Sequence, residues 1–288
     1  RSVPMTNTNP RAILHSLVAR CQELRSPCGD GDLVWREWGA ANTERPPIVL
    51  LHGGFGAWNH WVRTIPALES QFRVIAVDLP GCGDSADPPK PYDAAGLAEI
   101  LSGGLDLILP DDTPFDLISF SFGGVLSGLL AHAQARRIRS LTLIGSPVLG
   151  LTGTGPANEL VEVPRDLPEA EAAPLYRHNL QKLMVHDPAA ADDLALTIQT
   201  VNMAKARLRS RGIARTSVLA DSLRDLPCRL NGIFGDKDTT LYPDLSGIRD
   251  YIEEIHPGAP IHVIPNAGHW VQFEAWEAVN KLLPDVLN

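Results

Sequence analysis

A serine stands directly after a short apolar run that is typical of a buried strand. The run is Phe115–Phe120, the serine is Ser121, and an apolar, helix-like stretch follows. The segment from Ser119 to Gly123 resembles the pattern Gly-x-Ser-x-Gly, with Ser119 in place of the first glycine. This pattern sets a serine hydroxyl on a sharp strand-to-helix turn, where it is open for nucleophilic attack. Ser121 is therefore the candidate nucleophile, and an ordinary glycine-containing turn is the alternative.

A histidine and an aspartate later in the chain have the chemistry to activate this hydroxyl. His269 lies on a glycine-containing loop after the run Ile261–Ile264, and Asp236 and Asp238 follow the run Leu230–Phe234. Serine, aspartate, histidine is the chain order of the catalytic triad in proteins that carry such an elbow. The histidine removes the serine proton and the carboxylate keeps its ring in the correct tautomer. We expect His269 as the base and Asp238 as the carboxylate, because Asp238 lies further into its loop than Asp236.

A glycine-rich loop offers hydrogen-bond donors for a developing oxyanion. The segment His52–Phe55 follows the apolar run Ile48–Leu51, and its glycines allow the backbone to approach a reacting carbonyl closely. An oxyanion hole needs two N–H groups, one after the nucleophile and one from such a loop. The sequence predicts the N–H groups of Phe122 and Gly54, with that of Phe55 as the alternative, and the loop histidine as a hydrogen-bonding brace. A phosphate loop is disfavoured because no Gly-Lys-Ser/Thr ending follows.

Apolar runs of strand length alternate with helix-like stretches over most of the chain. Such near-continuous runs are typical of a parallel sheet that is covered by helices on both faces. Ligands bind at the carboxyl ends of the strands in these sheets, which is where the candidate residues fall. The expected strands are Leu33–Trp38, Ile48–Leu51, Arg73–Val77, Phe115–Phe120, Ser140–Ile144, Leu230–Phe234 and Ile261–Ile264.

The alternation breaks within residues 148–215. Strand-like runs are missing from that part of the sequence, a Gly/Thr/Pro stretch opens it, and Asp187-Pro188 is typical of a helix start. We expect a core domain formed by residues 1–147 and 216–288 and a helical cap, residues 148–215, that lies over the sheet. The apolar positions expected on one face of a cap helix are Leu194, Ile198, Val201 and Leu208.

Together these residues resemble the α/β-hydrolase superfamily, over nearly the whole chain from Leu33 to Leu287. The segment Asp78–Ser85 adds to the resemblance, because the family often carries an Asp-x-x-Gly-x-Gly-x-Ser loop after its fourth strand. We expect that loop to shape the site without taking part in the chemistry. The resemblance implies a mostly parallel, doubly wound sheet with a helical cap. It also implies a serine hydrolase that works through an acyl-enzyme without a metal or organic cofactor.

Within the superfamily the chain is most similar to the group of meta-cleavage-product hydrolases, which cleave C–C bonds in aromatic breakdown, and small carboxylesterases. Gly268-His269-Trp270 is similar to the C–C hydrolase signature, in which the tryptophan packs on the substrate. Those enzymes usually carry asparagine where this chain has Phe120, and glycine where it has Ser119. The departures favour a small, largely apolar ester or related carbonyl substrate. C–C hydrolysis is one alternative, and a receptor-like protein that binds a ligand on the same fold is another.

A basic cluster in the expected cap is the candidate for binding an anionic group of the substrate. The resemblance implies a cap arginine that binds a carboxylate, and Arg207 is our candidate, with a solvated helix face as the alternative. Phe55, Phe120 and Trp270 are expected to contact the substrate as apolar or aromatic groups. The cluster consists of Lys205, Arg207, Arg209, Arg211 and Arg215.

Composition excludes several classes of partner. The chain has 25 basic and 34 acidic residues and a net charge of -9, which argues against nucleic acid or an anionic membrane, because phosphate binding depends on lysine and arginine.

No apolar run reaches the roughly 18 residues that span a bilayer. Residues 1–10 contain no apolar signal core, which favours a cytoplasmic location. None of the four cysteines has metal-ligand spacing, so no metal is expected. The expected partner is a small-molecule substrate, and the oligomeric state is left open.

Overall fold

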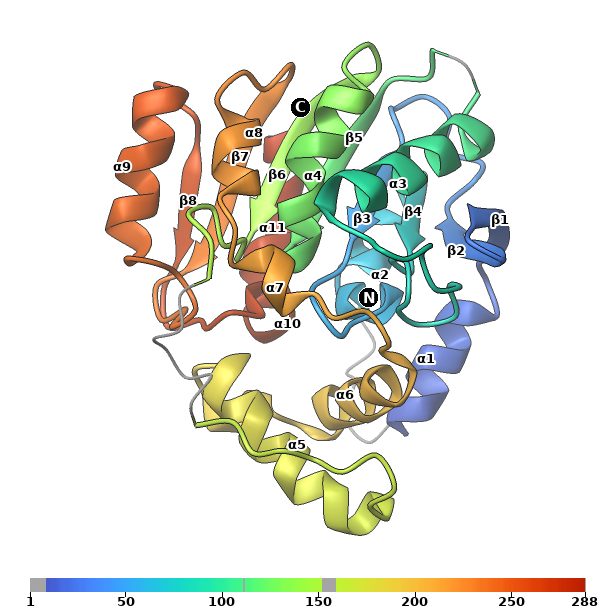
Figure 1. Cartoon of the computed structure of the whole chain (residues 1–288), viewed down its shortest axis with the longest axis vertical. Helices are drawn as coiled ribbons and strands as arrows, with labels where there is room; N and C mark the ends of the chain where they lie inside the picture. Colours follow the sequence, from blue (N-terminus) through green and yellow to red (C-terminus); the bar gives the residue numbers. More distant parts are fainter. Residues whose placement is uncertain (1–8, 111, 152–158, 288) are drawn as a thin grey trace.

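The computed structural model describes residues 9–110, 112–151 and 159–287 (Figure 1). Residues 1–8, which make up most of the segment considered for a signal core, lie outside the described residues. So do residues 152–156 of the Gly/Thr/Pro stretch that opens the expected cap.

Eight strands form one sheet in the order β1-β2-β4-β3-β5-β6-β7-β8. The strands from β3 to β8 pair in parallel, whereas β2 runs antiparallel to both β1 and β4. The mostly parallel sheet expected from the sequence is confirmed, and every expected strand is present. The bounds are β1 Gln22–Cys28, β2 Gly31–Trp38, β3 Ile48–Leu51, β4 Val74–Val77, β5 Phe115–Phe120, β6 Ile138–Ile144, β7 Arg229–Gly235 and β8 Ile261–Ile264.

Strand β1 is the element that the sequence did not predict. It pairs with β2 at the edge of the sheet, and its residues from Gln22 to Arg25 are exposed or half-buried. An edge strand needs little apolar surface, so its composition lacks the continuous apolar run of the central strands.

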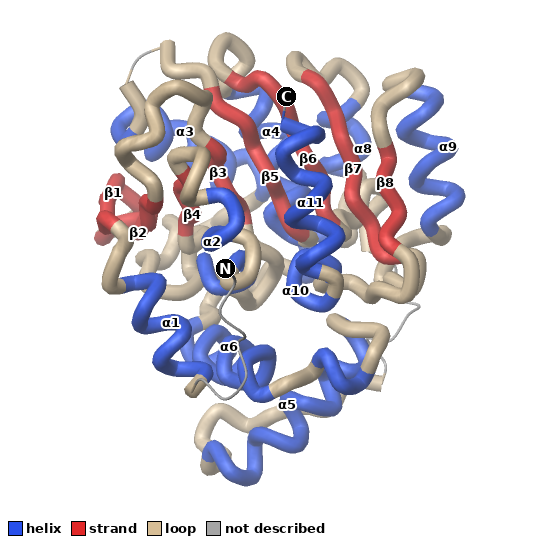
Figure 2. Tube along the Cα trace, turned by 180° about the vertical axis from the view of Figure 1, so that it is seen from behind, coloured by secondary structure: helices blue, strands red, loops and turns tan. Residues whose placement is uncertain are grey.

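Helices cover both faces of the sheet, as the views from the two sides show (Figures 1 and 2). One face carries α3, α4, α8 and α9, and the other carries α1, α2, α10 and α11. This double cover explains why the central strands are buried along their whole length. The bounds are α1 Pro10–Val18, α2 Ile65–Leu68, α3 Ala94–Ile108, α4 Phe122–Ala133, α8 Val218–Leu223, α9 Leu245–Ile255, α10 Val271–Glu274 and α11 Trp276–Leu287.

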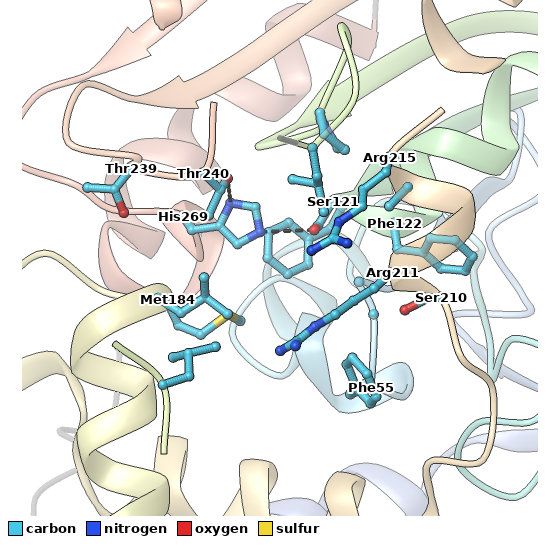
Figure 3. A pocket seen from close by; sticks show the side chains of 18 residues that line it. Phe55, Ser121, Phe122, Met184, Ser210, Arg211, Arg215, Thr239, Thr240 and His269 are labelled. Carbon is cyan, nitrogen blue, oxygen red and sulfur yellow. Dashed lines mark hydrogen bonds between the residues drawn. The ribbon is translucent and has the colours of Figure 1, made fainter. Parts of the chain in front are cut away.

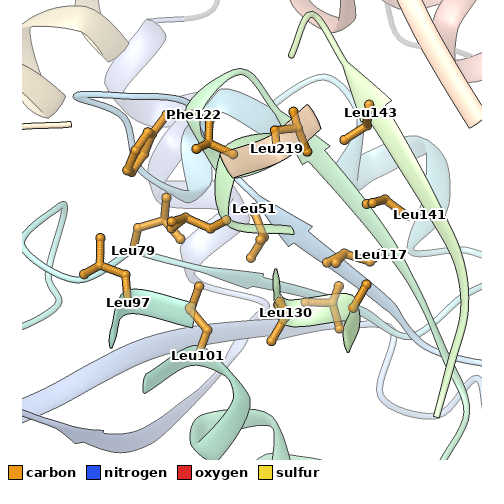
Figure 4. Close-up of a cluster of buried hydrophobic side chains, with 14 of the residues drawn as sticks. Leu51, Leu79, Leu97, Leu101, Leu117, Phe122, Leu130, Leu141, Leu143 and Leu219 are labelled. Carbon is orange, nitrogen blue, oxygen red and sulfur yellow. The ribbon is translucent and has the colours of Figure 1, made fainter. Parts of the chain in front are cut away.

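Alternate residues of each central strand enter separate cores. Leu51 of β3 and Leu117 of β5 pack with Leu101 of α3 and Leu130 of α4 (Figure 4). Ile118, the next residue of β5, faces the opposite core. Because side chains of a strand alternate between faces, a continuous apolar run supplies both cores at once.

The part of the chain between β6 and β7 is helical. Its described residues up to 215 contain α5 (Glu169–Leu183), a 3₁₀ turn at Pro188–Ala190, α6 (Asp193–Lys205) and α7 (Arg211–Ala214), and no strand. Helices α5 and α6 lie beyond the carboxyl ends of the parallel strands (Figure 1).

The structure differs from the expected helix start and from the expected helix face. Asp187 does cap a helical turn, accepting a hydrogen bond from Ala189 N–H, but that turn is only three residues long. The longer helix α6 is capped by Asp192 instead. Leu208 lies beyond the end of α6, so it does not share a helix face with Leu194.

Buried polar contacts hold α6 against the core. The side-chain amides of Asn59 and Asn202 exchange two hydrogen bonds of 2.9 and 2.8 Å, and both residues are buried. Arg63 adds an ion pair of 2.8 Å to Asp192, the cap of α6. Because unpaired buried amides are costly, this contact holds α6 at one position on the core.

Asp78, the first residue of the Asp78–Ser85 loop, organises the carboxyl end of β4. Its buried carboxylate pairs with Arg36 at 2.9 Å and accepts hydrogen bonds from Trp58 N–H at 2.8 Å and Asp84 N–H at 3.0 Å. These bonds connect the loop to the glycine-rich segment that precedes Trp58. The loop has the shaping role expected from the sequence.

We predict that Asp78→Ala lowers the free energy of unfolding by about 3–5 kcal/mol, because it removes the buried partner of the buried Arg36 guanidinium and leaves the exposed carboxylate of Asp84 as its closest partner. Chemical denaturation measures the change. Asp30→Ala is the control, because Asp30 is exposed and makes no ion pair within the described residues; it should change stability by less than about 0.5 kcal/mol. A loss below about 1 kcal/mol in Asp78→Ala would contradict the assignment.

Candidate active site

Ser121 sits on the turn between β5 and α4 with a backbone φ of 51°. Non-glycine residues rarely adopt this left-handed conformation, which is the strained geometry of a nucleophile elbow. Gly123 is required for the turn, because a Cβ there would lie 2.7 Å from the carbonyl oxygens of Leu51 and His52. Ser119 fits where a first glycine is usual; its hydroxyl is buried and has no partner in the described part of the chain.

The structure brings the three predicted side chains of the triad together. His269 Nε2 lies 2.9 Å from Ser121 Oγ, and His269 Nδ1 lies 2.8 Å from Asp238 Oδ2. The side chain of Asp238 is fully buried and that of His269 is 6% exposed. Asp236 is exposed and pairs with the neighbouring Lys237, so it does not take the position behind the histidine. This arrangement can transfer a proton from the serine to a base oriented by a carboxylate.

Thr240 contacts both members of the aspartate–histidine pair, a role that sequence reasoning missed. Its hydroxyl donates to Asp238 Oδ1 at 2.7 Å and lies 2.9 Å from His269 Nδ1, while its N–H donates to Oδ1 at 2.9 Å. One carboxylate oxygen is thereby occupied by Thr240, and the other is left for the imidazole. The only sequence signal was a hydroxyl residue two positions after the aspartate.

The backbone N–H groups of Gly54 and Phe122 have no acceptor among the described residues, and the same is true of the N–H of Phe55, the predicted alternative to Gly54. Phe122 is the first residue of α4, so its N–H lacks an intrahelical partner and lies at the positive end of the helix dipole. The carbonyl of Gly53 accepts a hydrogen bond from His52 Nδ1 at 2.7 Å. In a trans peptide the following N–H, that of Gly54, points the opposite way. The N–H groups of Gly54 and Phe122 are therefore available to a bound oxyanion.

Two buried histidines brace the glycine-rich loop. His52 donates from Nδ1 to the loop and accepts from Leu79 N–H at 2.9 Å, as its expected role requires. His60, which sequence reasoning did not single out, accepts from Gly53 N–H at 3.3 Å. Burial lowers the pKa of His52 and holds the pKa of His60 well below its usual value. Both rings are thus neutral at pH 7, which keeps an unprotonated nitrogen available as an acceptor.

A cavity of about 140 Å³ opens at Ser121 and His269. A dry cavity of ~150 Å³ holds a benzene ring, so the enclosed space suits a small substrate group. Gly54, Phe55, Phe120 and Phe122 line it, as expected, together with residues of the helical segment (Figure 3). The lining residues that sequence reasoning missed include Leu160, Leu183, Met184, Ser210, Thr239 and Thr240.

The basic cluster does reach the cavity, but through other members than the one predicted. Arg211 on α7 and Arg215 directly after it line the cavity (Figure 3). Neither has a carboxylate within 4 Å in the described part of the chain, and Arg211 lies 5.8 Å above the Phe55 ring. Their spacing of four residues is the one that brings side chains to the same side of a helical turn, although Arg215 lies just after the end of α7.

The predicted position of Arg207 is wrong. Its guanidinium pairs with Asp87 at 2.6 Å and donates to the carbonyl of Ser85, outside the cavity. The reason is the backbone: the N–H groups of Arg207 and Leu208 both bond the Gly81 carbonyl, in the segment between α6 and α7. The side chain is directed along the Asp78–Ser85 loop and so never faces Ser121.

The predicted substrate contact of Trp270 is also wrong. Its ring stacks on Phe273 with centroids 4.1 Å apart, and its Nε1–H donates to the His60 carbonyl at 3.1 Å. Only 1% of the residue is exposed, and it does not line the cavity. Trp270 therefore packs behind the site, supporting the loop that carries His269.

No cluster of three or more histidine, cysteine, aspartate or glutamate residues suited to a metal ion occurs in the described ranges. The four cysteines are free. Over the same ranges, no helix has the length and apolar character to cross a membrane.

Comparison with protein families identifies the class that this fold and site define. The model of the alpha/beta hydrolase family matches residues 48–282, and the chain belongs to that family. The family membership confirms the predicted fold, and the chain is a hydrolase with the features of a serine enzyme.

Curated relatives include hydrolases of dienoates. The chain is 27% identical over 249 residues to a 2-hydroxy-6-oxo-2,4-heptadienoate hydrolase of Pseudomonas putida, covering 84% of this chain and 88% of the relative. It is 31% identical over 258 residues to a dihydrolipoyllysine-residue acetyltransferase component of an acetoin cleaving system, also of Pseudomonas putida. That match covers 86% of this chain but 65% of the relative, so the chain spans about two thirds of that protein.

Solved structures show the same fold at low identity. A carboxylesterase of Bacillus subtilis superposes with a TM-score of 0.74 at 19% identity, covering 96% of this chain and 94% of the other. A meta-cleavage product hydrolase of Pseudomonas fluorescens superposes with a TM-score of 0.70 at 22% identity, covering 88% and 93%. The two neighbours differ in reaction, so the shared fold does not choose between ester and C–C cleavage.

We predict that Thr240→Val lowers kcat about tenfold and leaves KM nearly unchanged. The isosteric change removes the hydroxyl bond to the Asp238 carboxylate, and such a bond contributes about 1.5–3 kcal/mol. Thr240→Ser keeps the hydroxyl and should restore kcat to within about threefold. Thr239→Val is the matched control, because Thr239 lines the cavity but bonds neither residue. Equal kinetics in the valine and serine variants would remove the hydroxyl from this role.

Proposed function

We propose that the protein is a serine hydrolase in which Ser121, His269 and Asp238 form the catalytic triad. The observation that carries this proposal is the unbroken hydrogen-bonded series from Asp238 through His269 to Ser121, with distances of 2.8 and 2.9 Å. The strained φ of Ser121 and the free N–H groups beside it support the same assignment.

The reaction follows from these positions. His269 Nε2 accepts the proton of Ser121 as the hydroxyl oxygen attacks a carbonyl carbon of the substrate. The oxyanion accepts hydrogen bonds from the N–H groups of Gly54 and Phe122. His269 then gives the proton to the leaving group, and an acyl group stays on Ser121. Water, deprotonated by the same histidine, attacks the acyl carbon and frees the serine.

We propose a substrate with a small apolar body and one anionic group. The large apolar side chains in the cavity wall are leucine, phenylalanine and methionine, which suit the apolar part. Arg211 and Arg215 enter that wall without carboxylate partners in the described residues. Both arginines are exposed, so water weakens the attraction, but a carboxylate of the substrate can accept a charge-assisted hydrogen bond from them.

C–C bond hydrolysis is the second candidate function. The same arginine pair favours it, because a dienoate carries a carboxylate as well as the reacting carbonyl. The Phe120 side chain weighs against it, since the meta-cleavage hydrolases resembled by this chain usually have an asparagine amide there. Ester hydrolysis is therefore our first choice, with an anionic ester as the preferred form.

The remaining parts of the proposal concern organisation and location. Residues 148–215 act as a cap that closes the cavity over Ser121, with the core formed by residues 1–147 and 216–288. The substrate is a small molecule, and the cytoplasm is the location that the sequence favours. The oligomeric state is outside the proposal.

We predict that a fluorophosphonate labels the protein covalently at Ser121, because an activated hydroxyl beside a base and an oxyanion hole attacks phosphorus. Ser121→Ala should abolish labelling and lower kcat by roughly 10⁴–10⁶-fold. Intact-mass and peptide mass spectrometry locate the adduct, and Ser127→Ala, on the same helix, is the control. An adduct on Ser119 or Ser127, or none at all, would refute the nucleophile.

The substrate class is tested with two esters of equal length that differ in one charge, p-nitrophenyl butyrate and mono-p-nitrophenyl succinate. We predict that Arg211→Ala lowers kcat/KM for the succinate ester about 10–100-fold more than for the butyrate ester, through loss of a charge-assisted bond. Arg207→Ala is the control and should affect both esters equally.

Equal losses for the two esters in Arg211→Ala would mean that this arginine does not bind an anionic group. A 2-hydroxy-6-oxo-dienoate measured beside the esters decides between the two reactions. A dienoate preferred at least about tenfold over the succinate ester would replace ester hydrolysis by C–C hydrolysis as the function.

A further inference from the structure

Glu274, the last residue of α10, binds two separate loops beside the site. Its Oε1 accepts hydrogen bonds from His186 N–H at 3.0 Å and Asp187 N–H at 2.6 Å. Its Oε2 accepts from Gly268 N–H at 2.7 Å and shares the His186 N–H at 3.0 Å. One carboxylate thus receives three backbone N–H groups, two from the segment after α5 and one from the loop that carries His269.

The two loops are in direct contact at this point. Trp270 N–H donates to the Met184 carbonyl at 2.6 Å. Gly268 leaves no room for a side chain, since a Cβ there would lie 2.6 Å from the His186 nitrogen. The residues of these contacts flank His269 on both sides in the sequence, so the backbone on either side of the base is attached to residues 184–187.

The same segment reaches the substrate cavity. Leu183 and Met184, at the end of α5, line the cavity with His269. A displacement of residues 184–187 therefore changes the cavity wall. Because the segment and the loop share the Glu274 carboxylate, the displacement also moves the backbone that sets the direction of the imidazole ring.

We propose that Glu274 is a positioning residue that couples the docking of residues 184–187 to the orientation of His269 toward Ser121. The inference rests on the proposed function, since it assigns Glu274 an effect on the proposed base. The carboxylate needs both of its oxygens to accept from all three N–H donors, since Asp187 N–H bonds Oε1 and Gly268 N–H bonds Oε2. Glutamine keeps one acceptor oxygen, but its NH₂ group faces at least one of the N–H donors and repels it.

Steady-state kinetics provide the first test. Glu274→Gln should lower kcat about tenfold or more with KM within about twofold, because the base is misdirected while most of the cavity wall stays in place. Glu277→Gln is the matched control, because Glu277 is exposed and makes no side-chain bond in the described part of the chain. An unchanged kcat in Glu274→Gln, or an equal fall in both variants, would overturn the proposal.

The second test uses the reciprocity of coupling, which a purely structural contact would not show. A methylphosphonyl adduct on Ser121, made with a small fluorophosphonate, hydrogen-bonds His269 and holds its loop. In the wild-type protein the adduct should slow hydrogen exchange at the His186 and Asp187 amides at least about tenfold. In Glu274→Gln the slowing should fall to less than about twofold, whereas Glu277→Gln should behave as the wild type.

The outcomes separate the two proposals. Failure to form the adduct would refute Ser121 as the nucleophile and thus the proposed function. An adduct that forms in the wild-type protein but leaves the exchange of His186 and Asp187 unchanged would refute the coupling alone. The wild-type measurement decides this point even if Glu274→Gln does not fold. Slowing that persists undiminished in a folded Glu274→Gln would show that another contact carries the coupling.

Discussion

The hydrogen bond of 2.9 Å between His269 Nε2 and Ser121 Oγ is the contact on which the rest of the site depends. It joins residues 148 positions apart in the chain, so no local structure can form it. The parallel sheet brings the two loops to one edge, because β5 and β8 both end there. Thr240 and Asp238 orient the imidazole ring of His269 through hydrogen bonds. The strained turn at Ser121 orients the hydroxyl that the ring accepts from. A small error in any of these elements lengthens the one bond through which the proton passes.

The features that local chemistry determines were predictable from the sequence. The elbow at Ser121, the loop at Gly54 and the strands from β2 to β8 each have a pattern of a few adjacent residues. Asp238 was chosen over Asp236 because it lies further into the loop after its strand. Arg207 and Trp270 could not be placed in this way. Their directions depend on partners far along the chain, Asp87 for the arginine and Phe273 for the tryptophan. The spacing of Arg211 and Arg215 contained a helical signal, but the sequence did not say which face of that helix meets the cavity.

The local charge of the site is opposite in sign to that of the whole protein. The chain carries a net charge of -9, yet the charged side chains that line the cavity from the described part of the helical segment are two arginines. Net charge acts on the approach of a ligand over a Debye length of about 8–10 Å, whereas an arginine at the cavity wall acts at contact. An anionic substrate is therefore repelled at long range and held at short range. Its binding should depend on these few contacts rather than on the overall field of the protein.

The reciprocal amide pair of Asn59 and Asn202 has a consequence for how this protein can diverge. Each amide supplies the donor and the acceptor that the other requires, and both are buried. A single replacement at either position leaves the other buried amide without hydrogen-bond partners. Replacing both by apolar residues of similar shape removes both polar groups together. The two positions belong to different parts of the chain, one beside the glycine-rich loop and one on α6. Random drift must therefore pass through a less stable intermediate, so the helical segment and the core cannot change independently at this contact.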